Sequence, residues 1–136
     1  MEEFRVEFYS DFCEVDKYSI LMTDFIVKNN SDLSSEERFN INFALRELMN
    51  NAVEHGNCSD PQKKIFCTVI SREKRITLIV EDEGDGFDLS QEIFDNTKRD
   101  DLENRRRGIW VLKKLGFDVV VKKNKVTAQY KREGKE

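Results

Sequence analysis

The sequence is poor in the residues that build metal centres and disulfide frameworks. It contains three cysteines, Cys13, Cys58 and Cys67, and one histidine among 136 residues. Because the cysteines do not occur in paired spacings, neither a structural zinc site nor a disulfide framework is expected, and a reducing cytoplasm fits best. The only proline is Pro61, which we place in a loop.

Long apolar runs and an excess of positive charge are also missing. No apolar stretch approaches the ~20 residues that a membrane-spanning helix needs. The N-terminal residues Met-Glu-Glu-Phe-Arg do not resemble a signal peptide. The net charge is -4, so electrostatics give no reason to expect a nucleic acid as the main partner. We therefore expect no membrane and no direct nucleic-acid partner.

The composition is that of a well-solvated globular protein. Hydrophobic residues make up 38% of the chain and charged residues 37%, and ten phenylalanines supply most of the aromatic surface. A chain of this length is long enough to bury its own core, so we expect one domain over residues 1–136.

Hydrophobic periodicity predicts the order β-α-α-β-β-loop-α-β-β. The expected strands cover residues 4–9, 64–70, 75–81, 117–122 and 126–131. Two helices are expected to follow the capping-box patterns at 11–14 and 34–37, and a short one to run from 109 to a stop at Gly116. Residues 88–107 are highly charged and weakly periodic, and we expect a mobile segment there. This order predicts an α+β fold, a two-layer sandwich whose mixed, mainly antiparallel sheet carries helices on one face.

A polar ridge is expected at the end of the second helix. Glu47, Asn51 and His55 recur every four residues, so their side chains share one face. The ridge borders an apolar stripe that includes Leu48, which places it where a core surface meets a cleft. Gly56 follows and is suited to end the helix in the left-handed conformation. The alternative interpretation is a surface helix with an ordinary polar face.

A glycine-rich acidic turn follows the strand over residues 75–81. Gly84 and Gly86 allow positive φ and a close approach of the backbone to a ligand. Asp82, at the end of the strand, is suited to accept a hydrogen bond from an exocyclic amine. Since the acidic charge would repel phosphates, this turn is expected to hold the uncharged end of a ligand. A plain acidic turn is the alternative.

A run of arginines precedes the expected last helix. Arg105, Arg106 and Arg107 come directly before Gly108. Positive charge combined with free N–H groups at a helix start favours anionic phosphate. An arginine run on a solvated helix face is the alternative.

Taken together, these three motifs resemble the N, G1 and G2 boxes of the GHKL ATP-binding superfamily, from about residue 3 to 131. The resemblance is greatest to the stand-alone bacterial anti-sigma factor serine/threonine kinases, which are short chains that begin with a strand and end soon after the third box. Here the third box is continued by Gly108-Ile-Trp-Val-Leu.

The resemblance implies that ATP and Mg²⁺ are the cofactors. Asn51 corresponds to the Mg²⁺ ligand, and an amide oxygen is a hard donor that suits this ion. Glu47 corresponds to the general base, and His55 belongs to the same box. Residues 88–107 correspond to the ATP lid.

The resemblance also implies where the base and phosphates bind. Asp82 corresponds to the acceptor of the adenine amine, with Gly84 and Gly86 as the turn beneath the base, and Thr127 is similar to a threonine that helps to hold adenine. The phosphates would be met by Arg105, Arg107 and Gly108.

The third box departs from the usual pattern. Relatives commonly have a glycine where this chain has Arg106. This side chain would either contact phosphate or stiffen the lid and weaken nucleotide binding. Arg105 is near the place of a lid arginine of the kinase-type relatives but is not clearly in register with it, so its role stays open.

By resemblance, the chain would be a serine/threonine kinase that phosphorylates an anti-sigma factor antagonist of the STAS type. It would sequester a sigma factor and form a homodimer. The alternative is a nucleotide-gated protein-binding switch without significant turnover. A histidine-kinase catalytic domain would need a phosphoacceptor helix pair, and a gyrase-like ATPase a transducer domain, and we see neither in the sequence.

Overall fold

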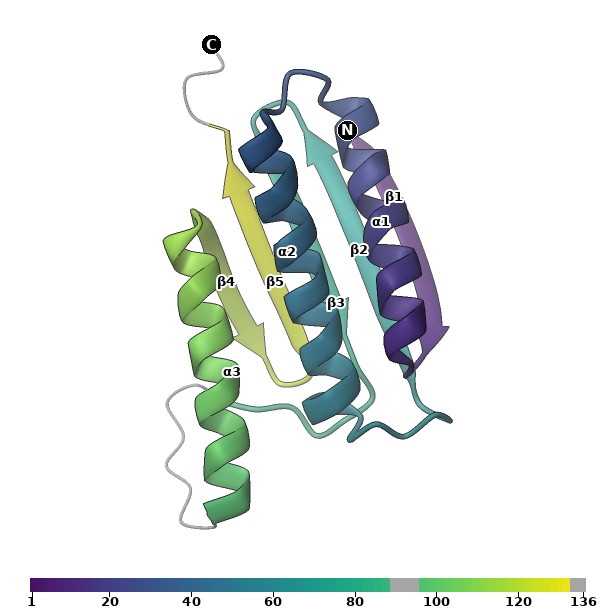
Figure 1. Ribbon diagram of the computed structural model, residues 1–136, viewed down its shortest axis with the longest axis vertical. Coiled ribbons are helices and arrows are strands. Elements are labelled where there is room, and N and C mark those ends of the chain that lie inside the picture. The colour runs from purple at the N-terminus through teal and green to yellow at the C-terminus, as the bar shows by residue number, and fades with distance from the viewer. Residues whose placement is uncertain (89–95, 133–136) are drawn as a thin grey trace.

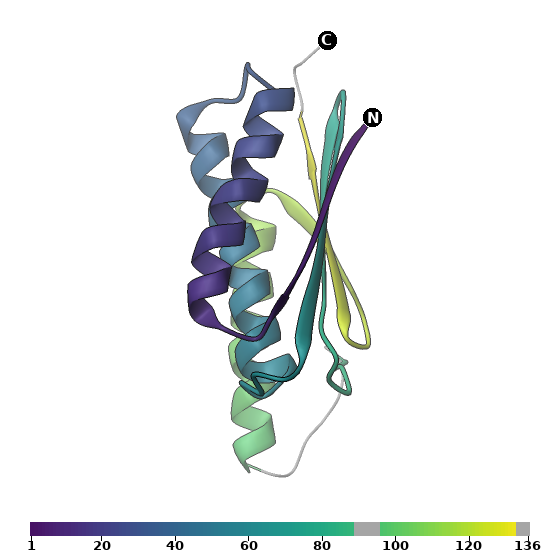
Figure 2. The same ribbon diagram turned by 90° about the vertical axis from the view of Figure 1, so that its right-hand side faces the viewer.

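The protein forms two layers, seen in a computed structural model that describes residues 1–88 and 96–132, with residues 96–99 described by their backbone alone. Within these residues, three α-helices cover one face of a five-stranded sheet (Figure 1, Figure 2). The elements are β1 (Glu2–Tyr9), α1 (Phe12–Asn29), α2 (Ser35–Asn51), the π-helical turn η1 (Ala52–Gly56), β2 (Lys64–Arg72), β3 (Arg75–Glu81), α3 (Asn96–Lys114), β4 (Phe117–Lys122) and β5 (Lys125–Lys131). The predicted α+β class and element order are confirmed.

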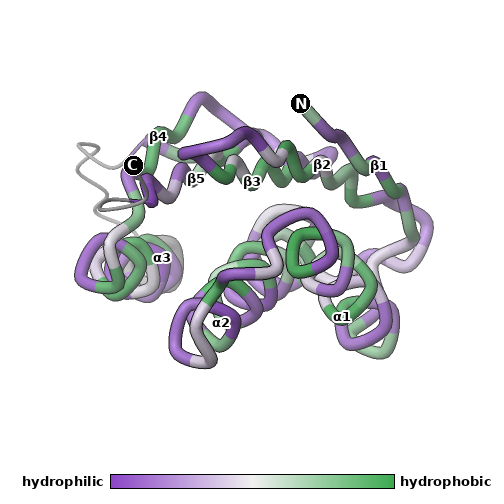
Figure 3. The backbone as a smooth tube through the Cα atoms, turned by 90° about the horizontal axis from the view of Figure 1, so that it is seen from above, coloured by the Kyte–Doolittle hydropathy of each residue, from purple (hydrophilic) through white to green (hydrophobic). Residues whose placement is uncertain are grey.

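The sheet has the strand order β1-β2-β3-β5-β4, and every pairing between described strands is antiparallel, so the sheet is not mixed as predicted. Alternate residues of each strand face the helices because successive side chains point to opposite faces. On β2 and β3 these residues are fully buried: Ile65, Cys67, Val69, Ile76, Leu78 and Val80. Figure 3 shows the helices on one side of the sheet, with α1 near β1 and β2 and α3 near β4. The core lies between these layers.

Polar side chains cap both N-terminal helices as the sequence indicates. The Oδ1 atom of Asp11 accepts the N–H of Cys13 at 2.7 Å at the start of α1. At α2 the full capping box is present, because Ser34 and Glu37 each bond the backbone N–H of the other at 3.0 Å. No helix in residues 1–88 and 96–132 is both long enough and apolar enough to cross a membrane.

The third helix is much longer than the periodicity predicted. It begins at Asn96 rather than near residue 109, so the expected mobile segment is helical over 96–107. Residues 89–95 of that segment lie outside the described part of the chain. The buried stripe of this helix is Leu102, Arg105, Ile109 and Leu112, spaced by three and four as a helix requires. An arginine at one of these core positions hides the pattern. The helix ends at Lys114, two residues before the predicted stop at Gly116, which has φ +102°.

The end of α2 also differs from the prediction. The chain does not turn left-handed at Gly56 but continues through the π-helical turn η1. Positive φ values occur two and three residues later, at Cys58 (52°) and Ser59 (57°). Gly56 is needed for another reason, because a Cβ there would collide with the carboxylate of Asp82.

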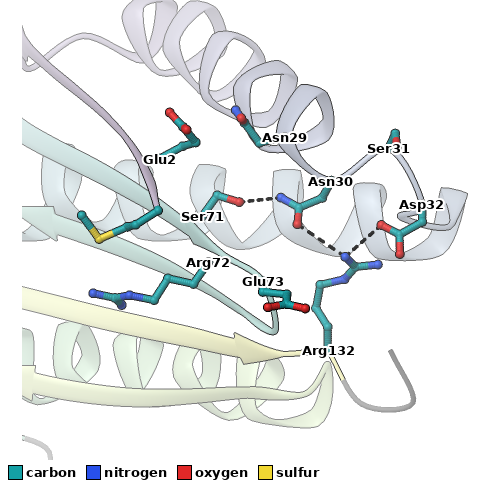
Figure 4. Close-up of a pocket in the computed structure, with 10 residues that line it drawn as sticks. Glu2, Asn29, Asn30, Ser31, Asp32, Ser71, Arg72, Glu73 and Arg132 are labelled. Carbon is teal, nitrogen blue, oxygen red and sulfur yellow. Dashed lines mark hydrogen bonds and ion pairs between the residues drawn. The ribbon is translucent and has the colours of Figure 1, made fainter. Parts of the chain in front are cut away.

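A buried polar network joins the residues that follow α1 to β2 and to Arg132, the residue after β5 (Figure 4). Asn30, after α1, donates to Ser71 Oγ of β2 at 2.7 Å and to the Ile26 carbonyl oxygen at 2.9 Å. The Arg132 guanidinium lies 2.9 Å from Asp32 and 3.4 Å from Asn30 Oδ1. The network borders a cavity of about 520 Å³. Since Arg132 is already paired there, we interpret this network as structural.

Candidate nucleotide site

The three predicted motifs meet at one small cavity between α2, β3 and α3. Each motif contributes one polar lining residue, Asn51, Asp82 and Arg105 respectively. Apolar side chains complete the walls, including Leu48, Val80 and Val126. The three predicted segments, which are far apart in the chain, therefore line one cavity.

Glu47 and Asn51 form the polar edge of α2 that the four-residue spacing predicts. The Asn51 Nδ2 donates to Glu47 Oε1 at 3.4 Å, and both side chains are partly exposed. An amide oxygen and a carboxylate on one helix face are suited to a hard cation such as Mg²⁺.

His55 is turned away from this cavity and toward α3. Its imidazole is 9% exposed, and Nδ1 lies 3.2 Å from Oδ1 of Asp101 on α3. Nε2 lies 3.8 Å from Glu54. In this conformation His55 links η1 to α3 and does not line the cavity.

Asp82 is the buried carboxylate of the site. Its residue is 7% exposed, and its Oδ1 accepts the N–H of Gly84 at 2.8 Å. Burial raises the pKa of Asp82 above its ordinary value, although the Gly84 N–H and the charge of Arg105 offset part of this effect. Asn124, in the β4–β5 turn, holds the backbone of Asp82 through two hydrogen bonds.

Two glycines let the loop after β3 pack closely. A Cβ on Gly84 would collide with the carbonyl oxygen of Gly56. Gly86 has φ +83°, and a Cβ there would collide with the backbone of Lys123. The predicted positive φ occurs at Gly86 but not at Gly84, and the close approach of both glycines is to the protein's own backbone.

Arg105 is a buried arginine in the wall of the cavity. The residue is 6% exposed, and its Cζ atom lies 4.1 Å from the centre of the Phe87 ring. Nη2 donates a long hydrogen bond of 3.5 Å to the Asn51 carbonyl oxygen. Burial lowers the pKa of Arg105, and the charge of Asp82 opposes that shift. The cavity that it lines has a volume of about 20 Å³.

The rest of the arginine box lies inside a helix rather than at its start. Residues 105–108 belong to the middle of α3, where backbone N–H groups bond within the helix, so the predicted phosphate cradle of free N–H groups is wrong. Arg107 is exposed and donates to Asn104 at 2.8 Å, and Arg106 pairs with Glu103. Gly108 is buried against α2, where a Cβ would collide with the Glu47 carboxylate.

The structure does not bring Thr127 to the cavity. Ala128 is fully buried under the helices, and Val126 lines the cavity. Thr127 lies between them on β5, so alternation turns its side chain to the uncovered face of the sheet. Its register partners there are Ile79 and Val120.

Two residues that shape the candidate site were missed in the sequence. Phe87 lines the cavity and stacks on Arg105, and its position directly after Gly86 was the available signal. Asn57 is fully buried. Its Oδ1 accepts the N–H of Glu83 at 2.8 Å, and its Nδ2 donates to Ser10 and Lys64. It therefore joins the end of η1 to the loop that carries Asp82.

The donor set fits Mg²⁺ only in combination with a ligand. Among the described residues, no three His, Cys, Asp or Glu side chains gather as a metal site. A Mg²⁺ ion typically uses one or two protein oxygens together with phosphate oxygens and water. Glu47 and Asn51 match that pattern, and the buried carboxylate of Asp82 beside Phe87 matches an aromatic base with an amine.

The comparisons agree with this geometry. The family model of the histidine kinase-like ATPase domain matches residues 21–130, which include all three motifs. No curated protein matches the sequence.

Proposed function

The chain belongs to the histidine kinase-like ATPase family, and from this premise we propose that it binds ATP with Mg²⁺ between α2 and α3. The family description suggests ATP binding. The observation that carries the proposal is the convergence of Asn51, Asp82 and Arg105 on one cavity.

Each residue would contact the part of the ligand that suits its chemistry. Asp82, in a buried and aromatic setting, would accept the adenine amine. Asn51 would hold Mg²⁺ together with phosphate oxygens, and Glu47 stands one helical turn away. Arg105 and Arg107 supply positive charge on the helix that faces these groups. We interpret residues 88–107 as the ATP lid.

The finer proposal is a protein serine/threonine kinase. Bound ATP would supply the phosphoryl group, and Glu47 would accept the proton of the attacking hydroxyl. The sequence resemblance supports an anti-sigma factor antagonist of the STAS type as substrate, a sigma factor as the second partner, and a homodimer as the working form.

A nucleotide-gated switch without significant turnover is the second candidate. The small volume of the cavity, about 20 Å³, favours it, because a protein whose free state has too small a pocket for its ligand must change shape when the ligand binds. In that case ATP would set which partner is held, and Glu47 would contribute nothing to turnover.

Calorimetry with ATP and GTP, each with and without Mg²⁺, tests the proposed ligand. We expect ATP to bind more tightly than GTP, because guanine presents a carbonyl where adenine presents the amine that Asp82 accepts. Asn51→Ala should weaken the Mg²⁺-dependent part of the affinity. Asn50→Ala is the matched control, since it removes the same side chain one position along α2. Equal affinity for ATP and GTP contradicts the role of Asp82.

A further inference from the structure

The guanidinium of Arg105 occupies space that a nucleotide base would need. Arg105, Phe87 and Asp82 line a cavity of about 20 Å³, which is room for about one water molecule. Pockets for small-molecule ligands typically measure ~300 Å³ or more. A base cannot enter while Arg105 stays in place.

Arg105 makes contacts of the kind that adenine would make. Its flat guanidinium stacks on Phe87 at 4.1 Å, in the geometry of a cation–π contact. Its charge stabilises the ionised form of the buried Asp82 carboxylate. A flat group with N–H donors, stacked on an aromatic ring near a carboxylate, also describes the amine edge of adenine.

The N–H groups of Arg105 are poorly satisfied by hydrogen bonds in this position, which favours displacement of the side chain. The Nε atom of Arg105 is buried and has no hydrogen-bond partner among the described residues. Among the described residues, its guanidinium makes one hydrogen bond, the long one to the Asn51 carbonyl oxygen. A buried N–H without a partner costs free energy, so an entering ligand replaces an imperfect occupant.

We infer that Arg105 is an internal competitor for the adenine pocket, stacked on Phe87 in the nucleotide-free protein and displaced when a nucleotide binds. The inference rests on the proposed function and identifies Arg105 as the residue that limits the affinity of the protein for a nucleotide. Because Arg105 belongs to α3, its displacement also loosens α3 from α2, where Gly108 meets Glu47. Nucleotide binding would thereby be coupled to the position of the lid helix.

Adenosine binding tests the competitor directly, since adenosine has no phosphate for an arginine to hold. Arg105→Ala should bind adenosine about tenfold more tightly than the unaltered protein, because the binding-competent state no longer has to break a buried cation–π contact. Lys113→Ala is the control: it removes one positive charge from an exposed position of the same helix and should leave adenosine affinity unchanged. Unchanged or weaker adenosine binding by Arg105→Ala overturns the inference.

Chemical rescue provides an independent readout. Millimolar guanidinium chloride should compete with adenosine in Arg105→Ala, where the vacated place accepts the free ion. It should not compete in the unaltered protein beyond the effect of equal sodium chloride. Absence of competition in the variant overturns the inference.

NMR separates failure of the inference from failure of the proposed function. The Nε–H signal of Arg105, assigned by its loss in Arg105→Ala, should be ring-shifted by Phe87 and should lose that shift in Phe87→Leu. It should also lose the shift when ATP is added. An unshifted signal with normal ATP binding overturns the internal competitor alone. If neither the unaltered protein nor Arg105→Ala binds ATP, the proposed function and this inference both fail.

Discussion

Gly108 of α3 lies directly against the carboxylate of Glu47 on α2, so that a Cβ at position 108 would collide with Oε1 of Glu47. The contact joins two predicted motifs at the place where α3 meets the polar edge of α2. It explains a glycine in the middle of a helix, where this residue otherwise costs ~1 kcal/mol relative to alanine.

A double-mutant cycle tests this contact. In the unaltered background, Gly108→Ala should change the free energy of unfolding by less than about 1 kcal/mol, because the gain in helix propensity is offset by the displacement of Glu47. In the Glu47→Ala background the collision is absent, so the same change should stabilise by ~1 kcal/mol. Urea unfolding measures both. If Gly108→Ala changes the free energy of unfolding equally in the unaltered protein and in Glu47→Ala, the proposed collision between residue 108 and Glu47 is wrong.

Asp82 should reduce stability while providing specificity. Its pKa is raised, mainly by burial, so the folded state disfavours the ionised form. Asp82→Asn keeps an oxygen for the Gly84 N–H and removes the charge. We expect it to unfold at a higher temperature at pH 7, by no more than the equivalent of about 1 kcal/mol after solvent screening, and to bind ATP more weakly.

The pH dependence of this difference has a definite sign. An acid whose folded pKa is raised binds its proton more tightly in the folded state, so its cost is absent below the unfolded pKa and grows as pH rises. The stability advantage of Asp82→Asn should therefore open above about pH 3.8, the ordinary value for this group, and level off beyond the raised pKa. Melting temperatures of both proteins between pH 4 and 8 test this. A constant difference across that range contradicts the assignment.

The local pattern predicted most of the fold. The strands alternate with a period of two, and α2 carries both its capping box and an apolar stripe, so these elements could be predicted from neighbouring residues alone. α3 could not, because Arg105 takes a core position in its stripe. Its burial depends on Phe87 and Asp82, which lie in another segment of the chain.

The site was predicted to the level of segments but not of every side chain. The motifs indicated which segments converge, yet the orientation of Thr127 follows from the register of β5, where a shift of one residue reverses the face. The role of Gly56 likewise follows from its contact with Asp82 across the fold. Both depend on long-range packing that residue spacing does not reveal.

The buried polar network around Asn30 and Arg132 gives a prediction about stability alone. Asn30→Ala should cost ~2 kcal/mol, because it leaves the buried Ile26 carbonyl oxygen and Ser71 Oγ without their donor. Arg132→Met should stay within ~1 kcal/mol of the unaltered protein. The arginine is buried, and its Nε and Nη2 have no hydrogen-bond partner in the described ranges. Urea unfolding compares the two. If Arg132→Met lowers the free energy of unfolding as much as Asn30→Ala does, the prediction for Arg132 is wrong.

The last prediction distinguishes a kinase from a switch, and it concerns Glu47. If Glu47 is the general base, Glu47→Gln removes a group that acts only during transfer, while the size of the side chain and its contact with Asn51 are largely kept. General-base contributions are ~10²–10⁴-fold, so phosphoryl transfer should fall by that factor with little change in ATP affinity. Labelled ATP and a candidate antagonist protein, followed by an assay for acid-stable phosphate on Ser or Thr, measure the transfer.

The control and the possible outcomes make the comparison decisive. Glu36→Gln removes one carboxylate from an exposed position of the same helix, so its rate of transfer should equal that of the unaltered protein. Transfer at full rate by Glu47→Gln would leave a kinase but exclude Glu47 as its base. A protein that binds ATP yet labels no partner, with or without Glu47, would behave as the switch does, because a ligand that only shifts a conformational equilibrium needs no proton acceptor.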